Sequence, residues 1–177
     1  MLLSKNLEVR GQNLAGEKTV IVGIGEFRVA RAPAALITHN LGSCVGVALY
    51  DVRQRIGGLA HITLPSYKAM GSPQGKEVKF ADTAIPLMLK EMEKMGAHRS
   101  FMIAKIAGGA DMFGLPGNFS EMDIGRQNVE AVKDCLRRWG INLVAEEVLG
   151  SIPRTMELDL ITGRVILRTS QKKTRFL

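Results

Sequence analysis

The chain has 177 residues, of which 46% are hydrophobic and 23% are charged, and its formal net charge at pH 7 is +7. This length fits one domain, and this composition excludes a disordered chain, which carries fewer apolar residues. No apolar run reaches the ~20 residues that a membrane-spanning helix needs, and two cysteines are too few for a disulfide framework. We therefore expect a cytoplasmic protein with reduced thiols and no membrane insertion.

The positive charge is concentrated near the carboxyl end. Residues 164–177 carry five basic side chains and no acidic one, which is five of the seven net charges. Such a tail is either a solvated terminus or a docking arm for an acidic protein. Aromatic residues make up 5% of the chain and no nucleic-acid-binding motif is present, so we expect no nucleic-acid partner.

Patterns along the chain predict many short strands and two helices. In chain order they predict a strand at Thr19–Ile24, a short apolar run at Ala35–Thr38, strands at Cys44–Tyr50 and Ile56–Leu64, a surface loop at Pro65–Lys79, a helix at Ala81–Met95, a strand at Phe101–Ala107, a helix at Gly125–Trp139, and strands at Ile141–Val148, Thr155–Leu160 and Arg164–Arg168. Two helices against several strands predict an α/β sandwich with mixed strand pairing and helices on at least one face. We expect one domain over residues 1–177, with a short N-terminal extension over about 1–18 and a basic tail over about 169–177.

A thiol and an imidazole stand out between the apolar runs. Small and polar residues fill the segment 38–44, which places Cys44 at a turn leading into a strand, and His61 lies in an otherwise apolar segment. If residues 44–50 and 56–64 form a hairpin that turns near Val52–Gln54, Cys44 and His61 face each other across it. An imidazole beside a thiol can take its proton and make a nucleophile. The alternative from the residues alone is a packing cysteine and a satisfied core histidine.

The segments 38–51 and 57–65 closely resemble the CheD family of bacterial chemotaxis, whose members are chemoreceptor glutamine deamidases. The resemblance extends over roughly residues 23–167. Further matches are at 82–86, 104–113, Ile124-Gly125, Asn128 and Gly140-Ile141. Three positions depart from the family pattern: Gln127 stands where a basic residue is usual, and Leu149 and Pro153 replace glycines.

The resemblance implies a role for several residues. It implies that Cys44 is the nucleophile, that His61 is the catalytic histidine and that Thr38 supports the histidine. The residue pattern adds candidate substrate-binding positions, which include Gly42, Ser43, Gly108 and Gly109. The backbone N–H groups around Gly42–Cys44 are the expected oxyanion donors, and the glycine pair 108–109 is a place for close approach of a substrate chain.

The same resemblance implies a reaction and its partners. The expected reaction is hydrolysis of glutamine side chains to glutamate in methyl-accepting chemotaxis receptors, through a cysteine thioester and without metal or cofactor. The expected fold is similar to the catalytic domain of cytotoxic necrotizing factor toxins, and the phosphatase CheC is an expected partner. Two alternatives stay open, namely a non-catalytic docking module for receptors or CheC and another kind of cysteine amidohydrolase.

Overall fold

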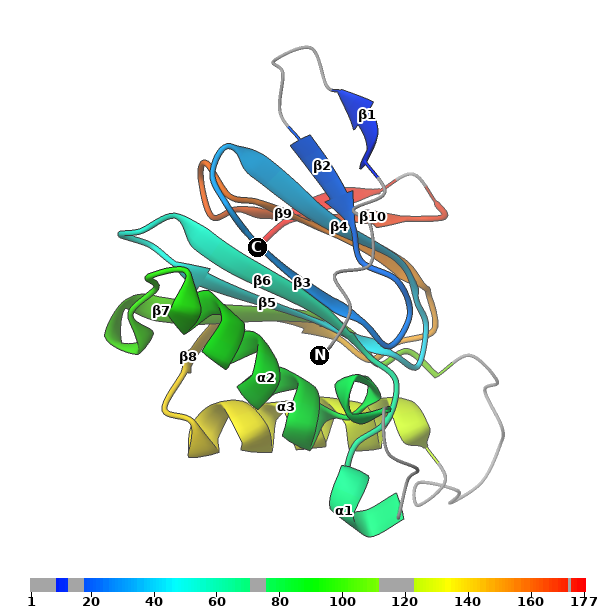
Figure 1. The fold of residues 1–177 in the computed structure, drawn as a ribbon. Helices are drawn as coiled ribbons and strands as arrows, with labels where there is room; N and C mark the ends of the chain where they lie inside the picture. The colour runs from blue at the N-terminus through cyan, green and yellow to red at the C-terminus, as the bar shows by residue number, and fades with distance from the viewer. Residues whose placement is uncertain (1–8, 13–17, 71–75, 112–122, 172) are drawn as a thin grey trace.

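The computed structural model describes residues 9–12, 18–70, 76–111, 123–171 and 173–177. Two β-sheets pack face to face, and two long helices cover the outer face of one of them (Figure 1). One apolar cluster fills the space between the helices and the five-stranded sheet, and a second fills the space between the two sheets. The predicted α/β sandwich with mixed pairing and two main helices is confirmed. Its likeness to the necrotizing factor domain stays a prediction.

The six-stranded sheet forms the outer layer. Its strands, in spatial order, are β1 (Val9–Gln12), β2 (Lys18–Ile21), β4 (Ala34–Leu41), β9 (Arg154–Asp159), β10 (Val165–Thr169) and β11 (Thr174–Phe176). Strands β2 and β4 run parallel, and the other described neighbours in this sheet run antiparallel.

The five-stranded sheet is the middle layer. Its strands, in spatial order, are β3 (Phe27–Arg31), β6 (Ile56–Ile62), β5 (Val45–Asp51), β7 (Met102–Gly108) and β8 (Asn142–Val148). Strands β7 and β8 run parallel, and the other pairs run antiparallel. Every residue of β5 and β6 is buried because one face of this sheet meets the helices and the other meets the second sheet.

The helices pack on the middle layer through apolar stripes. Helix α2 (Ala81–Lys94) and helix α3 (Ile124–Arg138) each bury one face, and the Asp123 side chain caps α3 by accepting a hydrogen bond from the N–H of Arg126. Short elements are α1 (Tyr67–Met70) and the 3₁₀ turns Glu77–Lys79 and Arg99–Phe101. No helix in the described ranges is long and apolar enough to span a membrane.

Both predicted helices and most of the predicted strands are present, with ends shifted by a few residues at most. The predicted loop at 65–79 is wrong in part, because α1 and a 3₁₀ turn lie within it, while residues 71–75 lie outside the described part. The basic tail is exposed to solvent, as one interpretation predicted, but it is not a frayed end, since β11 pairs with β10. Within the N-terminal extension, Val9–Gln12 forms strand β1, and residues 1–8 and 13–17 lie outside the described part. The single domain over the whole chain stays a prediction.

Candidate active site

The β5–β6 hairpin brings the two candidate residues, Cys44 and His61, near each other, in a register that differs from the predicted one. The predicted pairing places Cys44 opposite His61, but the structure pairs Gly46 with His61 and Asp51 with Ile56. Cys44 comes just before β5, so it lies two residues beyond the partner of His61, in the diagonal position. Diagonal neighbours on one face of a sheet are within side-chain reach.

Asp51 sets this register because its buried carboxylate organises the turn. Its Oδ1 accepts hydrogen bonds from the N–H of Arg53 at 2.8 Å and of Gln54 at 3.0 Å, and its Oδ2 accepts from the N–H of His98 at 2.7 Å. Burial alone would raise the pKa of Asp51, but these backbone donors outweigh it and the pKa is lowered. The turn therefore takes four residues, 52–55, whereas the predicted pairing of Cys44 with His61 would leave two, 52–53.

His61 lies between the two sheets and contacts a hydroxyl from the opposite one. Its side chain is fully buried, and its Nδ1 is 2.7 Å from Oγ1 of Thr38 on β4. The Thr38 hydroxyl donates its single proton to the carbonyl of Val22 at 2.9 Å. Its oxygen must therefore accept the bond from the imidazole, which places the ring proton on Nδ1. The Nε2 lone pair is left free to take a proton.

The burial of His61 keeps the imidazole neutral. Desolvation lowers the pKa of His61 to about 4, from an ordinary value of about 6.5. Its Nε2 is buried and has no hydrogen-bond partner among the described residues. A buried nitrogen without a partner is costly, and such sites are often functional. The ring is thus held as a neutral base with one nitrogen anchored and the other available.

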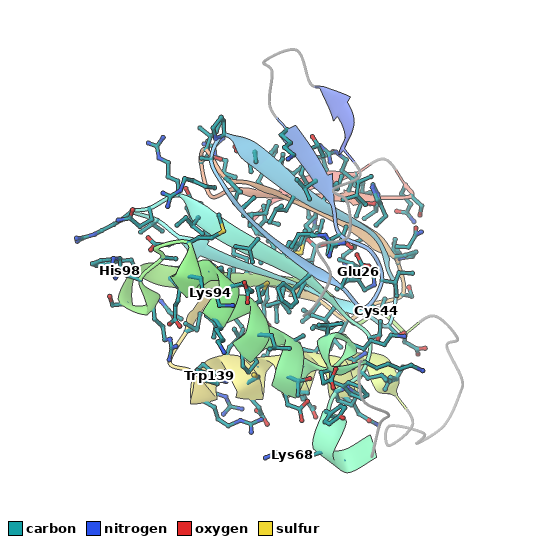
Figure 2. All side chains as sticks on the ribbon, viewed as in Figure 1. Glu26, Cys44, Lys68, Lys94, His98 and Trp139 are labelled. Carbon is teal, nitrogen blue, oxygen red and sulfur yellow. The ribbon has the colours of Figure 1, made fainter. Side chains whose placement is uncertain are left out.

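Cys44 faces the same layer as His61. It is half-buried and packs against the apolar cluster between the two sheets. Burial raises the pKa of the Cys44 thiol. At neutral pH the pair is therefore an uncharged thiol with an uncharged imidazole. Figure 2 shows Cys44 at one end of the strands and His98, beside the hairpin turn, at the other.

A β-bulge in β4 lies between Thr38 and Leu41, just before the loop that carries Cys44. Strand β4 pairs Thr38 with Met156 and Leu41 with Arg154, so three steps on β4 match two on β9. Asn40 takes the left-handed conformation at φ 59°, which asparagine tolerates better than most residues. The prediction that Cys44 lies at a turn leading into a strand is confirmed, since 42–44 form a bend before β5, while residues 38–41 of the same polar segment continue β4.

The loop 42–44 leaves two backbone donors unused. The N–H of Gly42 already donates to the carbonyl of Asn40 at 2.9 Å. Among the described residues, no hydrogen bond uses the N–H of Ser43 or of Cys44. Of the predicted oxyanion donors, Ser43 and Cys44 are therefore the available ones, and Gly42 shapes the loop.

Gly108 and Gly109, at the end of β7, contact the loop formed by residues 42–44. Gly108 has φ 114°, and a side-chain carbon there would lie 2.2 Å from the carbonyl oxygen of Cys44. Gly109 has φ 66°, donates its N–H to that same carbonyl at 2.8 Å, and would clash with Val129 on α3 if it carried a side chain. The close approach predicted for this pair is thus made to the protein's own backbone, while contact with a substrate stays a prediction.

Asn128 is a site residue to which the sequence analysis gave no role. It is fully buried on α3, and its Nδ2 donates to the carbonyls of Ser43 at 3.0 Å and Thr63 at 3.1 Å. It thereby connects the loop 42–44 to the segment after β6. The signal in the sequence is an amide on the apolar stripe of the helix, beside Val129 and one turn before Val132.

Further hydrogen bonds connect the end of β7 to the turn after β8 and to Arg154 on β9. The N–H of Leu149 donates to the carbonyl of Gly108 at 2.8 Å, and the nearly buried Arg154 donates to the carbonyls of Leu149 at 2.9 Å and Ile152 at 3.2 Å. Leu149, which stands where the family pattern has glycine, takes φ 64°, a conformation that glycine adopts more easily.

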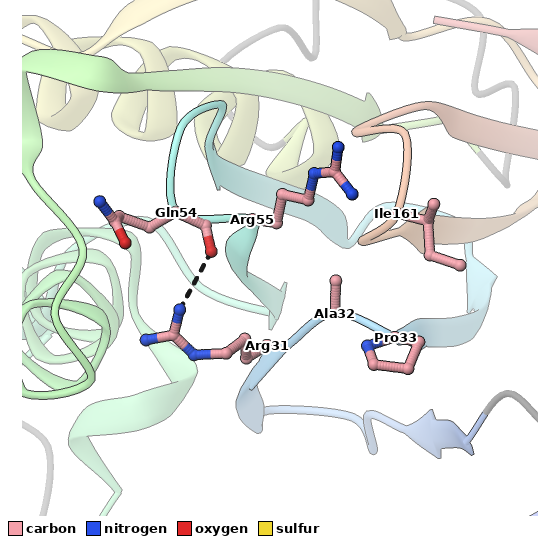
Figure 3. A pocket seen from close by; sticks show the side chains of 6 residues that line it. All are labelled: Arg31, Ala32, Pro33, Gln54, Arg55 and Ile161. Carbon is pink, nitrogen blue, oxygen red and sulfur yellow. Dashed lines mark hydrogen bonds between the residues drawn. The ribbon is translucent and has the colours of Figure 1, made fainter.

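The remaining candidates lie away from these groups. Cys135 is buried in the apolar cluster under α3, as expected for a packing residue, and burial raises its pKa to about 11. His39 is exposed, with its Nδ1 3.3 Å from the hydroxyl of Thr155. The hollow drawn in Figure 3 lies beside the β5–β6 turn at the opposite end of the hairpin and includes none of the predicted site residues.

Comparison with known proteins places these features in a family. The family model described as CheD chemotactic sensory transduction matches residues 63–169. A protein of Desulforamulus reducens named probable chemoreceptor glutamine deamidase CheD is 46% identical over 155 residues, which is 87% of this chain and 92% of the relative. A protein of Clostridium botulinum strain Hall with the same name is 45% identical over 152 residues, covering 86% and 93%.

Proposed function

Because the chain belongs to the CheD family, we propose that it hydrolyses the side-chain amide of glutamine residues in chemoreceptors, giving glutamate and ammonia. The observation that carries the chemical part of this proposal is the hydrogen bond between Nδ1 of His61 and the Thr38 hydroxyl, 2.7 Å long. It leaves Nε2 of a neutral imidazole unprotonated, on the layer where Cys44 packs.

The first half of the reaction forms a thioester. The Cys44 sulfur attacks the carboxamide carbon of glutamine while Nε2 of His61 takes the thiol proton. Since both groups are neutral beforehand, the proton moves as the carbon–sulfur bond forms, without a stored ion pair. The carbon–nitrogen bond then breaks, and His61 returns the proton to the departing ammonia.

The second half releases glutamate. Water donates a proton to Nε2 of His61 and its oxygen attacks the thioester carbon. The carbon–sulfur bond breaks and the proton passes to the Cys44 sulfur, which restores the free enzyme. Both tetrahedral intermediates carry a negative oxygen, and the unused N–H groups of Ser43 and Cys44 are the proposed donors to it.

Thr38 acts through His61 in this scheme and not on the substrate. Its hydroxyl is anchored on the carbonyl of Val22, so the imidazole cannot rotate without losing a buried hydrogen bond. Asn128, Gly108 and Gly109 hold the backbone of residues 43–44 from three sides. We propose the cytoplasm as the place of action and the CheC phosphatase as a further protein partner.

The test is direct conversion of a receptor. The protein is incubated with a cytoplasmic chemoreceptor fragment, and peptide mass spectrometry follows the change from amide to acid at each glutamine. We expect conversion by the wild type and by Cys135→Ala, and none by a folded Cys44→Ala variant. A receptor left unchanged by the wild type favours the docking-module alternative, and conversion by Cys44→Ala would exclude the thioester route.

A further inference from the structure

A hollow of about 260 Å³ lies where the basic tail meets the start of β9. Its walls carry three cationic side chains and one carboxylate, together with polar and apolar groups. The lining residues are Glu147, Ile152, Arg154, Leu167, Thr169, Gln171, Lys173 and Arg175. This volume is below the ~300–1,000 Å³ of pockets that hold drug-sized molecules, and it suits a single side chain.

The single carboxylate in the wall already forms two ion pairs within the protein. Glu147 contacts the Arg154 guanidinium at 3.3 Å and the Arg175 guanidinium at 3.3 Å. Lys173 and the remaining donors of Arg175 face solvent on the tail. The wall therefore keeps an excess of positive charge after its internal pairing, which favours an anionic ligand.

A hydroxyl in the same wall lacks a partner. Oγ1 of Thr169, which lies directly opposite Arg154 in the β9–β10 pair, is buried and makes no hydrogen bond to any described residue. A buried hydroxyl without a partner costs free energy, and a ligand oxygen that reached it would remove that cost. The hollow thus offers a neutral donor beside its cations.

A short chain of bonded residues connects this hollow to the nucleophile. Arg154 donates to the carbonyl of Leu149, the N–H of Leu149 donates to Gly108, and the N–H of Gly109 donates to the carbonyl of Cys44. On the other side, Arg154 pairs with Leu41, three residues before Cys44. The start of β9 and the turn after β8 thus connect the wall of the hollow to the loop that carries the thiol.

We propose that this hollow binds a carboxylate side chain of the protein substrate, an aspartate or glutamate near the glutamine that reaches Cys44. The inference rests on the proposed deamidase function and adds to it a preference for acidic sequence around the target. Lys173 and Arg175 supply the charge, and Thr169 supplies a hydrogen bond once its side chain turns its shielded hydroxyl toward the hollow. The basic tail is then a part of the substrate site that acts on binding and not on the chemical step.

The experiment compares two peptides and two charge-reversed proteins. One peptide is a chemoreceptor segment with its target glutamine and neighbouring acidic residues, and the other has those acidic residues replaced by alanine. The test protein is Lys173→Glu/Arg175→Glu. The matched control is Lys90→Glu/Arg137→Glu, which makes the same charge change at exposed positions of α2 and α3.

For the acidic peptide we expect the test protein to raise KM about 5-fold to 10-fold with kcat unchanged, an effect that weakens at high salt. For the alanine peptide the wild type and the test protein should have equal KM. Thr169→Val, which keeps the shape and removes the hydroxyl, should raise KM for the acidic peptide alone. Equal KM values for test protein, control and wild type on the acidic peptide would overturn the proposal, as would an equal loss on both peptides.

Binding separates this proposal from the deamidase function itself. A fluorescent copy of each peptide is titrated into Cys44→Ala protein with and without the two charge reversals. Tighter binding of the acidic peptide that disappears on charge reversal supports the hollow even if the wild type converts neither peptide. If the double variant does not fold, Lys173→Gln/Arg175→Gln and Thr169→Val carry the same test, and no loss of affinity in them overturns it.

Discussion

Burial controls the protonation of Cys44 and His61, the proposed catalytic pair. It raises the pKa of the Cys44 thiol and lowers that of His61 to about 4, so neither carries charge at neutral pH. A cysteine that is stored as a thiolate needs a nearby cation, and the neutral imidazole does not supply one. This favours a mechanism in which proton transfer coincides with attack of the sulfur on the substrate carbon, with no reactive thiolate in the resting protein.

The pKa of His61 predicts how stability depends on pH. The folded protein holds the ring neutral down to about pH 4, while the unfolded chain takes up a proton near pH 6.5, so stability falls as pH falls between these values. The loss attributable to His61 reaches about 3 kcal/mol at the acid end. Urea unfolding of the wild type and His61→Gln at about pH 7 and about pH 4.5 measures it. We expect a flatter profile for the variant, and parallel profiles would contradict the depressed pKa.

Thr38 provides a test of positioning without substrate contact. Thr38→Val removes the hydroxyl and keeps the shape, so His61 loses the partner that fixes its Nδ1 proton. We expect kcat to fall about 10-fold to 100-fold with little change in KM. Thr38→Ser retains a hydroxyl and should recover most of the rate in the same deamidation assay. A serine variant as slow as the valine variant would count against the hydrogen bond as the cause.

At the scale of elements, the end of β7 packs closely against the loop before β5 because β7 ends in two glycines, which have no side chains. Gly108 lies against the Cys44 carbonyl, and Gly109 lies against Gly125 and Val129 of α3. Strand, loop and helix can approach this closely only where a β-carbon is absent. The glycines therefore determine where the thiol lies, although neither is placed to react.

Replacing one of these glycines should displace the thiol. Gly108→Ala puts a methyl group 2.2 Å from the Cys44 carbonyl oxygen, so the loop must move, and we expect kcat to fall at least about 10-fold with a loss of about 2–4 kcal/mol of stability. Gly140→Ala is the matched control, because Gly140 also has positive φ, at 67°, but has nothing within 4 Å of the added methyl. It should cost about 1 kcal/mol and keep full activity. Deamidation kinetics and urea unfolding of both variants decide the matter, and an active Gly108→Ala protein would contradict this role.

At the scale of the whole molecule, two sheets bring together residues that are far apart in the chain. Thr38 comes from the six-stranded sheet and His61 from the five-stranded one, and Asn128 comes from a helix on the far side of the latter. The basic tail forms β11, the edge strand of the six-stranded sheet, which pairs with β10. Lys105 of the middle layer donates to the carbonyls of Gly163 and Leu177. The tail is thus part of the packed structure.

This placement changes the expected result of removing the tail. Truncation after Ser170 deletes β11, exposes the edge of β10 and removes one acceptor of the Lys105 ammonium. We expect a loss of about 1–3 kcal/mol of stability, measured by urea unfolding, besides any loss of affinity for a receptor. A truncated protein as stable as the full chain would show that the β10–β11 pairing contributes little. Point substitutions at Lys173 and Arg175 are therefore the sharper test of docking.

The sequence by itself determined the class of fold, most of the strands, both long helices and the choice of Cys44, His61 and Thr38. These follow from hydrophobic periodicity and from a local motif resemblance, which depend on neighbours in the chain. It could not give the hairpin register, because the buried Asp51 carboxylate, which binds an amide from residue 98, holds a turn that is two residues longer than the predicted pairing allows. It missed β3 and β11, which are short and rich in arginine or exposed.

Only the tertiary structure decided how the site works. The position of the proton on His61 follows from Thr38 and Val22, which lie 23 and 39 residues away in the chain and meet the ring because two sheets stack. The pKa values follow from burial, which depends on the whole surrounding structure. The hollow beside the tail likewise involves β8, β9, β10 and β11. Of its three cations, Lys173 and Arg175 were visible in the sequence only as part of a charged tail, and Arg154 lies on β9.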